Sequence, residues 1–304
     1  MFRVLDIATK IILGTIFAVV LIGRFSAAQA GSFKVLHSFS GATDGCYPVG
    51  GVILDGAGNL YGTTGGGACN SCGTVFKLAP NGTETLLHDF TCGGNGQEPA
   101  ATLVMDKKGN LYGTTVNGGS IGCGVIFKVT PAGREKTVHD FAGPPTDGCS
   151  ASAPLVMDAN GKFYGTTSGG GKHREGNVFK LAPDGTETVT HSFNSRRSGD
   201  DPVAGLVMDV NGNLYGVDSG GGAKDFGTAF EIAPDGAETL LHTFRGSPRD
   251  GSVPDGTLIS DQSGNFYGTL RDSGLAGCDA NEGCGGVFKL APGRYRNDSP
   301  FLHR

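Results

Sequence analysis

The sequence predicts an all-β protein, a five-bladed β-propeller with four antiparallel strands in each blade. Three observations lead to this fold class. One motif set recurs five times at intervals of about fifty residues, and each copy holds four short apolar segments separated by turn residues. Glycine supplies 54 of the 304 residues without a Gly-X-Y period, which indicates many tight turns. Because one repeat cannot bury its own apolar face, the copies are expected to pack into one domain.

Three motifs define the repeat. The tyrosines of a Tyr-Gly motif are 51 or 52 residues apart, and so are the histidines of a His-x-Phe motif. The tyrosines are Tyr61, Tyr112, Tyr164, Tyr215 and Tyr267. The histidines are His37, His88, His139, His191 and His242. A phenylalanine in a segment like Val-Phe-Lys-Leu recurs at Phe76, Phe127, Phe179, Phe230 and Phe288.

The first copy shows the expected strands. They cover residues 52–54, 59–64, 74–78 and 85–90, which are rich in β-branched and aromatic residues and too short for amphipathic helices. An Asp-Gly-Ala-Gly-Asn turn from Asp55 joins the first pair, and Asn81-Gly82 joins the second pair. Both turns supply the positive φ values that tight connections need. Aspartate capping its own turn is preferred to a calcium loop here, because the ligand spacing of such loops is missing.

The two ends of the repeat array complement each other. Residues 33–39 match a fourth strand without the three that should precede it, and residues 286–290 match a third strand without its fourth. The N-terminal strand is therefore predicted to complete the last blade, which leaves no unpaired sheet edge. The alternative is a fragment of a longer repeat array.

Residues 1–30 have the pattern of a signal peptide. The apolar run from Ile11 to Gly23 is about 20 Å long as a helix, short of a ~30 Å hydrocarbon core. Ala28 and Ala30 form the small-x-small pattern that precedes cleavage. The alternative is a retained membrane anchor. We expect a propeller domain over residues 31–292, a short tail over 293–304, and a secreted, periplasmic or cell-surface monomer with no membrane span after cleavage.

Charge and cysteine content restrict the function. Residues 1–30 carry +2 of the net charge of −5, so the remaining chain is at −7 and a nucleic-acid partner is not expected. Export permits disulfides among the eight cysteines. Strand register favours Cys72–Cys92, Cys123–Cys149 and Cys46–Cys284. A rival scheme pairs Cys46 with Cys69 and Cys278 with Cys284.

Candidate binding residues lie in the longer loops at one end of the blades, the top face. Polar loop residues expected near the mouth of a central channel are Asp44, Asn95, Asp147, Asp200 and Asp250. They form either a polar or cation-binding mouth, with structural Ca²⁺ as the cofactor considered, or simple aspartate turns. A basic set in the third repeat is formed by Lys172, Arg174, Arg196 and Arg197, which either holds an anionic polymer or is solvated. No catalytic residue and no metal ligand is predicted, because the five repeat histidines lie on different blades and cannot share one ion.

The blocks Gly58-Asn59-Leu60-Tyr61-Gly62-Thr63-Thr64 and Gly73-Thr74-Val75-Phe76-Lys77-Leu78 resemble the GloVer tandem repeat family. This choice-of-anchor family occurs in exported bacterial proteins with varied C-terminal anchors. The resemblance covers about residues 31–292 and implies a secreted or surface-displayed propeller of unknown activity, without catalytic residues to transfer. Residues 293–304 contain no apolar span or sorting motif, so a C-terminal anchor is not expected here.

The sequence favours a non-enzymatic exported module that binds an extracellular or cell-surface partner, a glycan or a protein, through its top face. One alternative is a carbohydrate-active enzyme, a glycoside hydrolase or lyase, with a top-face acidic site. That chemistry needs two placed carboxylates, and the chain has no tryptophan for sugar stacking. A structural spacer is the third alternative.

Overall fold

The computed structural model describes residues 33–41, 44–66, 72–92, 94–246, 248–272 and 284–291. The chain divides into two units, residues 1–36 and residues 37–304, and every strand belongs to the second unit. The described residues form strands and turns and contain no helix. The predicted signal peptide and the predicted tail lie outside the described residues.

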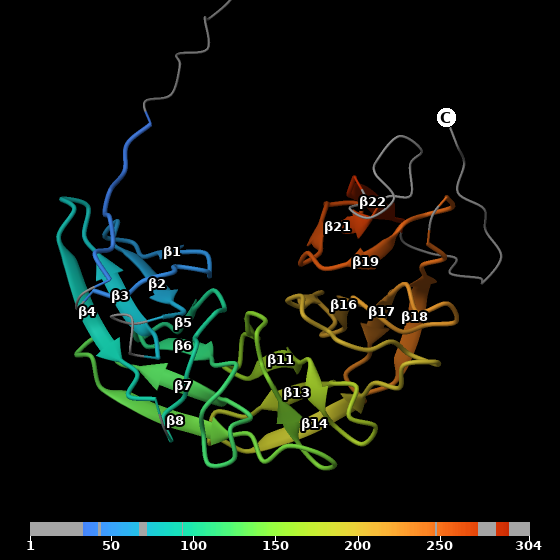
Figure 1. Ribbon diagram of the computed structural model, residues 1–304, viewed down its shortest axis with the longest axis horizontal. Coiled ribbons are helices and arrows are strands. Elements are labelled where there is room, and N and C mark those ends of the chain that lie inside the picture. Colours follow the sequence, from blue (N-terminus) through green and yellow to red (C-terminus); the bar gives the residue numbers. More distant parts are fainter. Residues whose placement is uncertain are drawn as a thin grey trace, which may run out of the picture. The chain divides into compact units, whose positions relative to one another are not determined.

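Five antiparallel sheets of four strands follow one another along the chain, and each sheet occupies one band of colour in Figure 1. The first sheet contains β1 (Ile53–Leu54), β2 (Leu60–Thr64), β3 (Thr74–Leu78) and β4 (Glu84–Asp89). The second contains β5 (Val104–Met105), β6 (Leu111–Thr114), β7 (Val125–Val129) and β8 (Glu135–Asp140). The third contains β10 (Val156–Met157), β11 (Phe163–Thr167), β13 (Asn177–Leu181) and β14 (Glu187–Ser192). The fourth contains β15 (Val207–Met208), β16 (Leu214–Asp218), β17 (Thr228–Ile232) and β18 (Glu238–Thr243).

The last repeat departs from this order. Its sheet contains β19 (Ser252–Pro254), β20 (Ile259–Ser260), β21 (Phe266–Asp272) and β22 (Gly286–Leu290). Both β19 and β20 pair with β21, along its two halves, and β22 pairs with the opposite edge of β21. A sixth, two-stranded sheet joins β9 (Gly148–Cys149) to β12 (Gly169–Gly170). The described residues therefore form six sheets, where the sequence predicted five four-stranded blades.

The predicted completion of the last sheet is not confirmed. Among the described residues β22 has one strand partner, β21, and residues 33–41 form no strand. The fifth sheet thus has four strands for a different reason from the other four sheets. It includes β19, whose pairing with the end of β21 matches the β9–β12 pair and the isolated bridges of the other repeats, and the outer fourth strand is not seen among the described residues.

Phenylalanines connect consecutive sheets. Phe127 of β7 is fully buried, and the ring of Phe90, which follows β4, meets it edge-on with 5.0 Å between ring centroids. The same contact recurs at every junction, at Phe39–Phe76, Phe141–Phe179, Phe193–Phe230 and Phe244–Phe288, with centroid separations between 5.0 and 5.4 Å. Aromatic pairs favour such separations. The repeated Phe therefore supplies both the core of a sheet and its contact with the next sheet.

The Tyr-Gly motif serves packing and turn formation. A Cβ on Gly113 would lie 2.6 Å from Cζ of Phe127, so only glycine lets this ring cross the second strand. The hydroxyl of Tyr112 donates to Asp106 Oδ2 at 3.3 Å, and Asp106 Oδ1 accepts from the backbone N–H of Asn110 at 2.9 Å. The segments that resemble calcium loops are thus aspartate-capped turns, as predicted.

A β-bulge precedes the repeat histidine in each of the first four sheets. In the second sheet Ile126 faces His139 and Phe127 faces Thr137, which leaves Val138 as the extra residue of β8. The register shifts at the same place in the first, third and fourth sheets. A bulge re-aims the side chains that follow it, and here it directs the histidine toward the loop that leaves the sheet.

Candidate functional site

The repeat histidines face the polar loop residues that the sequence placed at the channel mouth. His139 Nε2 lies 3.0 Å from Asp147 Oδ2, and His242 Nε2 lies 2.9 Å from Asp250 Oδ2. The equivalent pairs are His37 with Asp44 at 3.5 Å and His88 with Asn95 at 3.3 Å. These four loop side chains thus turn back to the fourth strand of their own repeat, or in the case of Asp44 to the segment that matches one.

Backbone donors hold the same aspartates. Asp147 Oδ2 accepts from the N–H of Ala142 at 2.8 Å and Oδ1 from the N–H of Gly148 at 2.6 Å. Burial raises the pKa of Asp147, but the hydrogen bonds from His139 and these amides hold it below its usual range. Hydrogen bonds from the Ser40 side chain and backbone lower the pKa of Asp44 to about 2. These carboxylates are engaged within their own loops.

Asp200 is the exception in this set. It forms an isolated bridge with Gly220 and makes no contact with His191. Burial raises the pKa of Asp200, and the nearby negative charges of Asp225 and Glu175 raise it further. His191 instead lies 3.6 Å from Glu238 of the following sheet.

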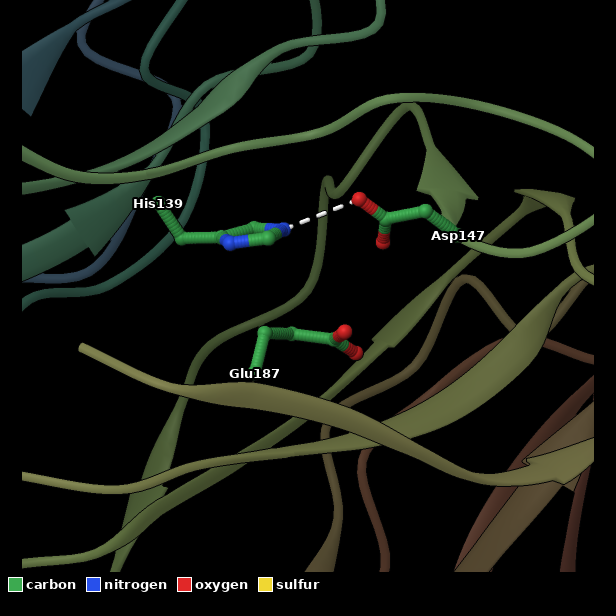
Figure 2. Close-up of side chains that lie close together, drawn as sticks. All are labelled: His139, Asp147 and Glu187. Carbon is green, nitrogen blue, oxygen red and sulfur yellow. Dashed lines mark hydrogen bonds and ion pairs between the residues drawn. The ribbon is translucent and has the colours of Figure 1, made fainter.

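A glutamate that the sequence analysis overlooked completes the contact between sheets. Glu187 opens β14, and a carboxylate oxygen of it lies within 4.8 Å of His139 and Asp147 ligand atoms (Figure 2). Burial, and then the charge of Asp147, raise the pKa of Glu187 to about 7. The equivalent residues are Glu84, Glu135 and Glu238, at the repeat spacing. The repeat spacing of these glutamates could have marked them as equivalent positions. It could not show that Glu187 meets His139 and Asp147, because those two residues belong to the preceding repeat.

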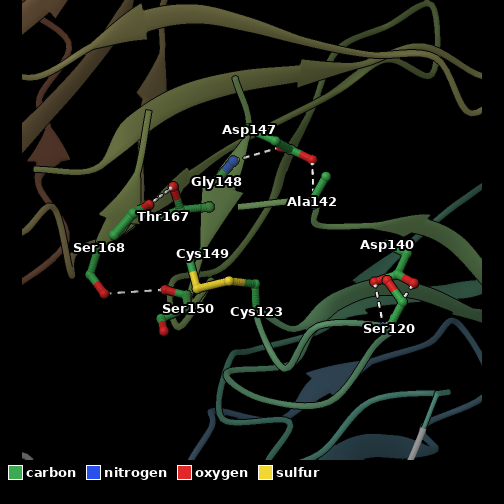
Figure 3. Close-up of a disulfide and its surroundings, with 11 residues drawn as sticks. Ser120, Cys123, Asp140, Ala142, Asp147, Gly148, Cys149, Ser150, Thr167 and Ser168 are labelled. Atoms are coloured by element: carbon green, nitrogen blue, oxygen red, sulfur yellow. Dashed lines mark hydrogen bonds between the residues drawn. A yellow bond between two sulfur atoms is a disulfide. The ribbon is translucent and has the colours of Figure 1, made fainter. Parts of the chain in front are cut away.

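Two predicted disulfides are confirmed, and a third is wrong. Cys72 bonds to Cys92, and Cys123 bonds to Cys149 (Figure 3). Cys284 is disulfide-bonded, but not to Cys46. Cys46 lies instead in a short antiparallel bridge with Gly66 at the first sheet, with its N–H donating to the Gly66 carbonyl at 2.9 Å. The predicted partners would meet only if residues 33–39 lay along β22, a pairing that the described residues do not contain.

At one equivalent position, every repeat has a non-glycine residue in the left-handed backbone region. The residue after each bridge position has φ between 55° and 60°, and these residues are Tyr47, Glu98, Ser150, Asp201 and Val253. We call the surface formed by these five residues the loop face. Left-handed backbone costs about 1–2 kcal/mol for a non-glycine residue and persists where the surrounding structure enforces it. Here the Glu98 N–H donates to the Cys72 carbonyl at 2.8 Å, and Ser150 and Val253 donate to the preceding repeat in the same way.

A pocket of about 390 Å³ opens on the loop face between the first two repeats. It is lined by Tyr47, Val49, Gly65, Gly66, Cys72, Glu98, Ala100 and Val116. The Tyr47 ring is 75% exposed, and Glu98 Oε2 accepts from Asn117 Nδ2 at 2.9 Å. Its size lies within the range of small-molecule and side-chain sites, and its walls are apolar apart from one carboxylate.

The basic set lies in two exposed loops of the third repeat. Lys172, Arg174, Arg196 and Arg197 are exposed. The backbone is fixed, since the Lys172 N–H donates to Ser192 Oγ at 3.2 Å and the Arg197 N–H donates to the Asn194 carbonyl at 2.7 Å. Their charged groups are therefore displayed to solvent on ordered loops.

The fold and its loops define a class: an all-β repeat protein whose copies share packing residues and differ in one face. The chain belongs to the Gloeobacter/Verrucomicrobia repeat family, whose sequence profile matches residues 12–208 and 185–298. No curated protein matches the chain.

Several solved structures are similar at low identity. A gluconolactonase from Xanthomonas campestris is 15% identical over 83% of this chain and 78% of that chain, with a TM-score of 0.47. A putative gluconolactonase is 14% identical over 76% and 74%, with a TM-score of 0.44. A protein of unknown function from Dyadobacter fermentans is 13% identical over 72% and 74%, with a TM-score of 0.44.

The two disulfides fit an extracellular or periplasmic protein. Within the described residues there is no helix of membrane-spanning length and hydrophobicity.

Proposed function

We propose that the chain is exported and closes into a five-bladed propeller, with residues 33–39 as the outer strand of the last blade. Residues 37–46 support this proposal, because they already make the contacts that each fourth strand makes to the next sheet. Phe39 meets Phe76 edge-on, and His37 faces Asp44. A groove of about 400 Å³ along β22 supplies the space for the strand, and Val287 in it is 79% exposed.

The repeat also gives the register of this pairing. In the first sheet Val75 faces His88 and Phe76 faces Leu86, with Leu87 as the bulge residue. The equivalent positions pair Val287 with His37 and Phe288 with Val35, and they make Leu36 the bulge. Cleavage after Ala30 leaves this strand at the start of the mature chain, and N-terminal sequencing of exported material tests the cleavage.

We propose that the protein is a binding module and that the pocket on its loop face receives the ligand. The observation that carries this proposal is a pocket at the junction of two repeats that is lined by two left-handed residues, Tyr47 and Glu98. Its base is fixed by the Cys72–Cys92 disulfide. Side chains that differ between repeats on an otherwise repeating frame are typical of a binding surface.

The chemistry of the pocket favours a Lys or Arg side chain of a protein partner. The walls of Val49, Ala100 and Val116 suit an aliphatic stem, and long basic side chains bury their stems while their charge stays near solvent. The exposed Tyr47 ring and the Glu98 carboxylate both attract a cation. A glycan would need several converging hydrogen-bond groups, and the pocket offers one carboxylate.

An array that displays both short peptides and glycans tests this function with residues 31–304 as the probe. We expect binding to peptides that contain Lys or Arg. Tyr47→Ala removes the aromatic wall and should weaken binding roughly tenfold, and Glu98→Gln roughly twofold to fivefold, since exposed ion pairs contribute about 0–1 kcal/mol. The double variant Arg196→Ala, Arg197→Ala is the control and should bind as the natural chain does. Binding to glycans alone, or full binding by Tyr47→Ala, would refute the proposal.

A further inference from the structure

The contact of His139, Asp147 and Glu187 differs from an ordinary ion pair in one respect. Glu187 Oε1 is buried and has no hydrogen-bond partner among the described residues. Figure 2 shows its carboxylate directed toward the space between the His139 ring and the Asp147 carboxylate. Leaving such an oxygen unsatisfied is unfavourable, so a partner at this position would stabilise the protein.

The three side chains are held in place from both sheets. The His139 ring packs edge-on against Phe141 at 5.0 Å, and its side chain is 18% exposed. Asp147 is 8% exposed and accepts the two backbone hydrogen bonds from Ala142 and Gly148. Outer contacts of this kind orient the ligands in metal sites. Glu187 comes from the first position of β14, so the cluster spans the junction between the second and third sheets.

The other repeats lack one part of this arrangement. Asn95 replaces the aspartate beside His88, and His191 contacts Glu238 but not Asp200. His37, Asp44 and Glu84 have the right types, but the His37–Asp44 separation of 3.5 Å is longer, and these groups do not gather within 4.8 Å. The equivalent positions of the other repeats can therefore serve as controls for substitutions in this cluster.

We propose that His139 Nε2, Asp147 and Glu187 bind a divalent transition-metal ion, with Zn²⁺ as the best fit, at the junction of the second and third sheets. Zn²⁺ takes imidazole and carboxylate ligands at about 2.0–2.2 Å, which places ligand atoms about 3.3 Å apart in a tetrahedron. The His139–Asp147 separation of 3.0 Å is already close to this value. A small rotation of the Glu187 side chain brings in the third ligand, and water takes the fourth position.

The bound ion would replace the hydrogen bond between His139 and Asp147. His139 would then carry its proton on Nδ1 and offer the Nε2 lone pair, as a neutral imidazole ligand does. A set of one nitrogen and two oxygens suits Zn²⁺ better than Ca²⁺, which takes six to eight oxygen ligands. The ion would join two sheets, so its role would be structural.

Isothermal titration of chelator-treated residues 31–304 with ZnCl₂ at pH 8 tests the site. We expect Zn²⁺ binding and a higher melting temperature, because an ion that binds only the folded state stabilises it. Glu187→Gln should weaken Zn²⁺ binding at least tenfold. Glu238→Gln and Glu84→Gln, at the equivalent positions of other repeats, should leave this affinity unchanged. CaCl₂ should bind more weakly than ZnCl₂.

Glutamine keeps the shape of Glu187 and removes a buried charge, so the variant is expected to fold. Glu187→Asp is a second variant that keeps the charge but withdraws the carboxylate by one methylene, and it should also weaken binding. The proposal is overturned if the natural chain gives no Zn²⁺ binding, if Glu187→Gln binds Zn²⁺ within twofold of the natural chain, if Glu84→Gln alone loses binding, or if Ca²⁺ binds more tightly.

Discussion

Asp218 occupies a position that threonine holds in the first three repeats, at Thr64, Thr115 and Thr167. Its side chain is fully buried. The Thr228 hydroxyl lies 2.9 Å from the Ser198 carbonyl oxygen and 2.8 Å from Asp218 Oδ2. The Thr228 hydroxyl has one proton for these two acceptors, so both contacts are satisfied together only when Asp218 is protonated and donates to Thr228. Burial raises the pKa of Asp218 well above its usual value, in agreement with this assignment.

Replacing Asp218 with threonine should stabilise the protein at neutral pH. A folded-state pKa above the unfolded value means that the stability of the natural chain is complete below the unfolded pKa and falls as pH rises. Asp218→Thr restores the hydroxyl pair seen between Thr64 and Thr74 and should add on the order of 1–3 kcal/mol at pH 7. Denaturant unfolding at pH 7 and pH 4 checks this. The gain should shrink at pH 4, and an equal effect at both values would contradict the neutral acid.

Single residues also show what sequence alone can predict. The Tyr-Gly glycine, the Asp106 turn and the Cys72–Cys92 pair follow from repeat position, because each depends on contacts within one repeat. Asp147 was placed at a channel mouth because strand order shows which end of a sheet a loop occupies, but not where its side chains point. The bulge at Val138, which directs His139 toward Asp147, leaves no mark in the sequence pattern.

At the scale of strands, the fourth strand of each of the first four sheets begins with a glutamate, and those of the third and fourth sheets lie beside a histidine of the preceding sheet. Glu238 of β18 lies 3.6 Å from His191, and burial raises the pKa of Glu238 to about 7. Burying this carboxylate therefore favours its protonated form, and the junction between the third and fourth sheets becomes sensitive to pH.

Glu238→Gln should flatten the pH dependence of stability. Because the folded pKa lies above the unfolded one, the natural chain has this contribution in full below about pH 4.5 and loses it as pH rises to about 7. The group is partly exposed, so we expect a change of about 2 kcal/mol at most across this window. Thermal unfolding of both chains from pH 4.5 to 8 measures it. Parallel profiles for the two chains would count against a buried, protonated Glu238.

Strand boundaries were predictable to within about two residues in the first sheet. The expected segment 85–90 appears as Glu84–Asp89, and 74–78 appears as Thr74–Leu78. The longer β21 of the last repeat was not predicted: it extends to Asp272 and pairs with β19, where other repeats form a short bridge or the β9–β12 pair. Alternating apolar residues mark a strand, but they do not specify which of two neighbours pairs with its end.

At the scale of the molecule, the repeat predicts which residues are equivalent but not how the two ends of the repeat array pair. Four equivalent Phe contacts join consecutive sheets, and a fifth joins Phe39, in the segment before the first sheet, to Phe76. In the proposed closure, residues 33–39 would supply the outer strand of the last sheet. Closure would also fix β1, which follows Tyr47, and β5, which follows Glu98. It would thereby fix the geometry of the pocket on the loop face.

Hydrogen exchange along β22, resolved to single amides in residues 31–304, tests closure most directly. In an antiparallel strand with one partner, alternate N–H groups point toward that partner and the rest remain open to solvent. If residues 33–39 pair with the outer edge of β22, every amide from Val287 to Lys289 should be protected, as in β13, which has β11 and β14 on its two sides. Protection at alternate amides only, with the outward N–H groups exchanging freely, would contradict the closed propeller.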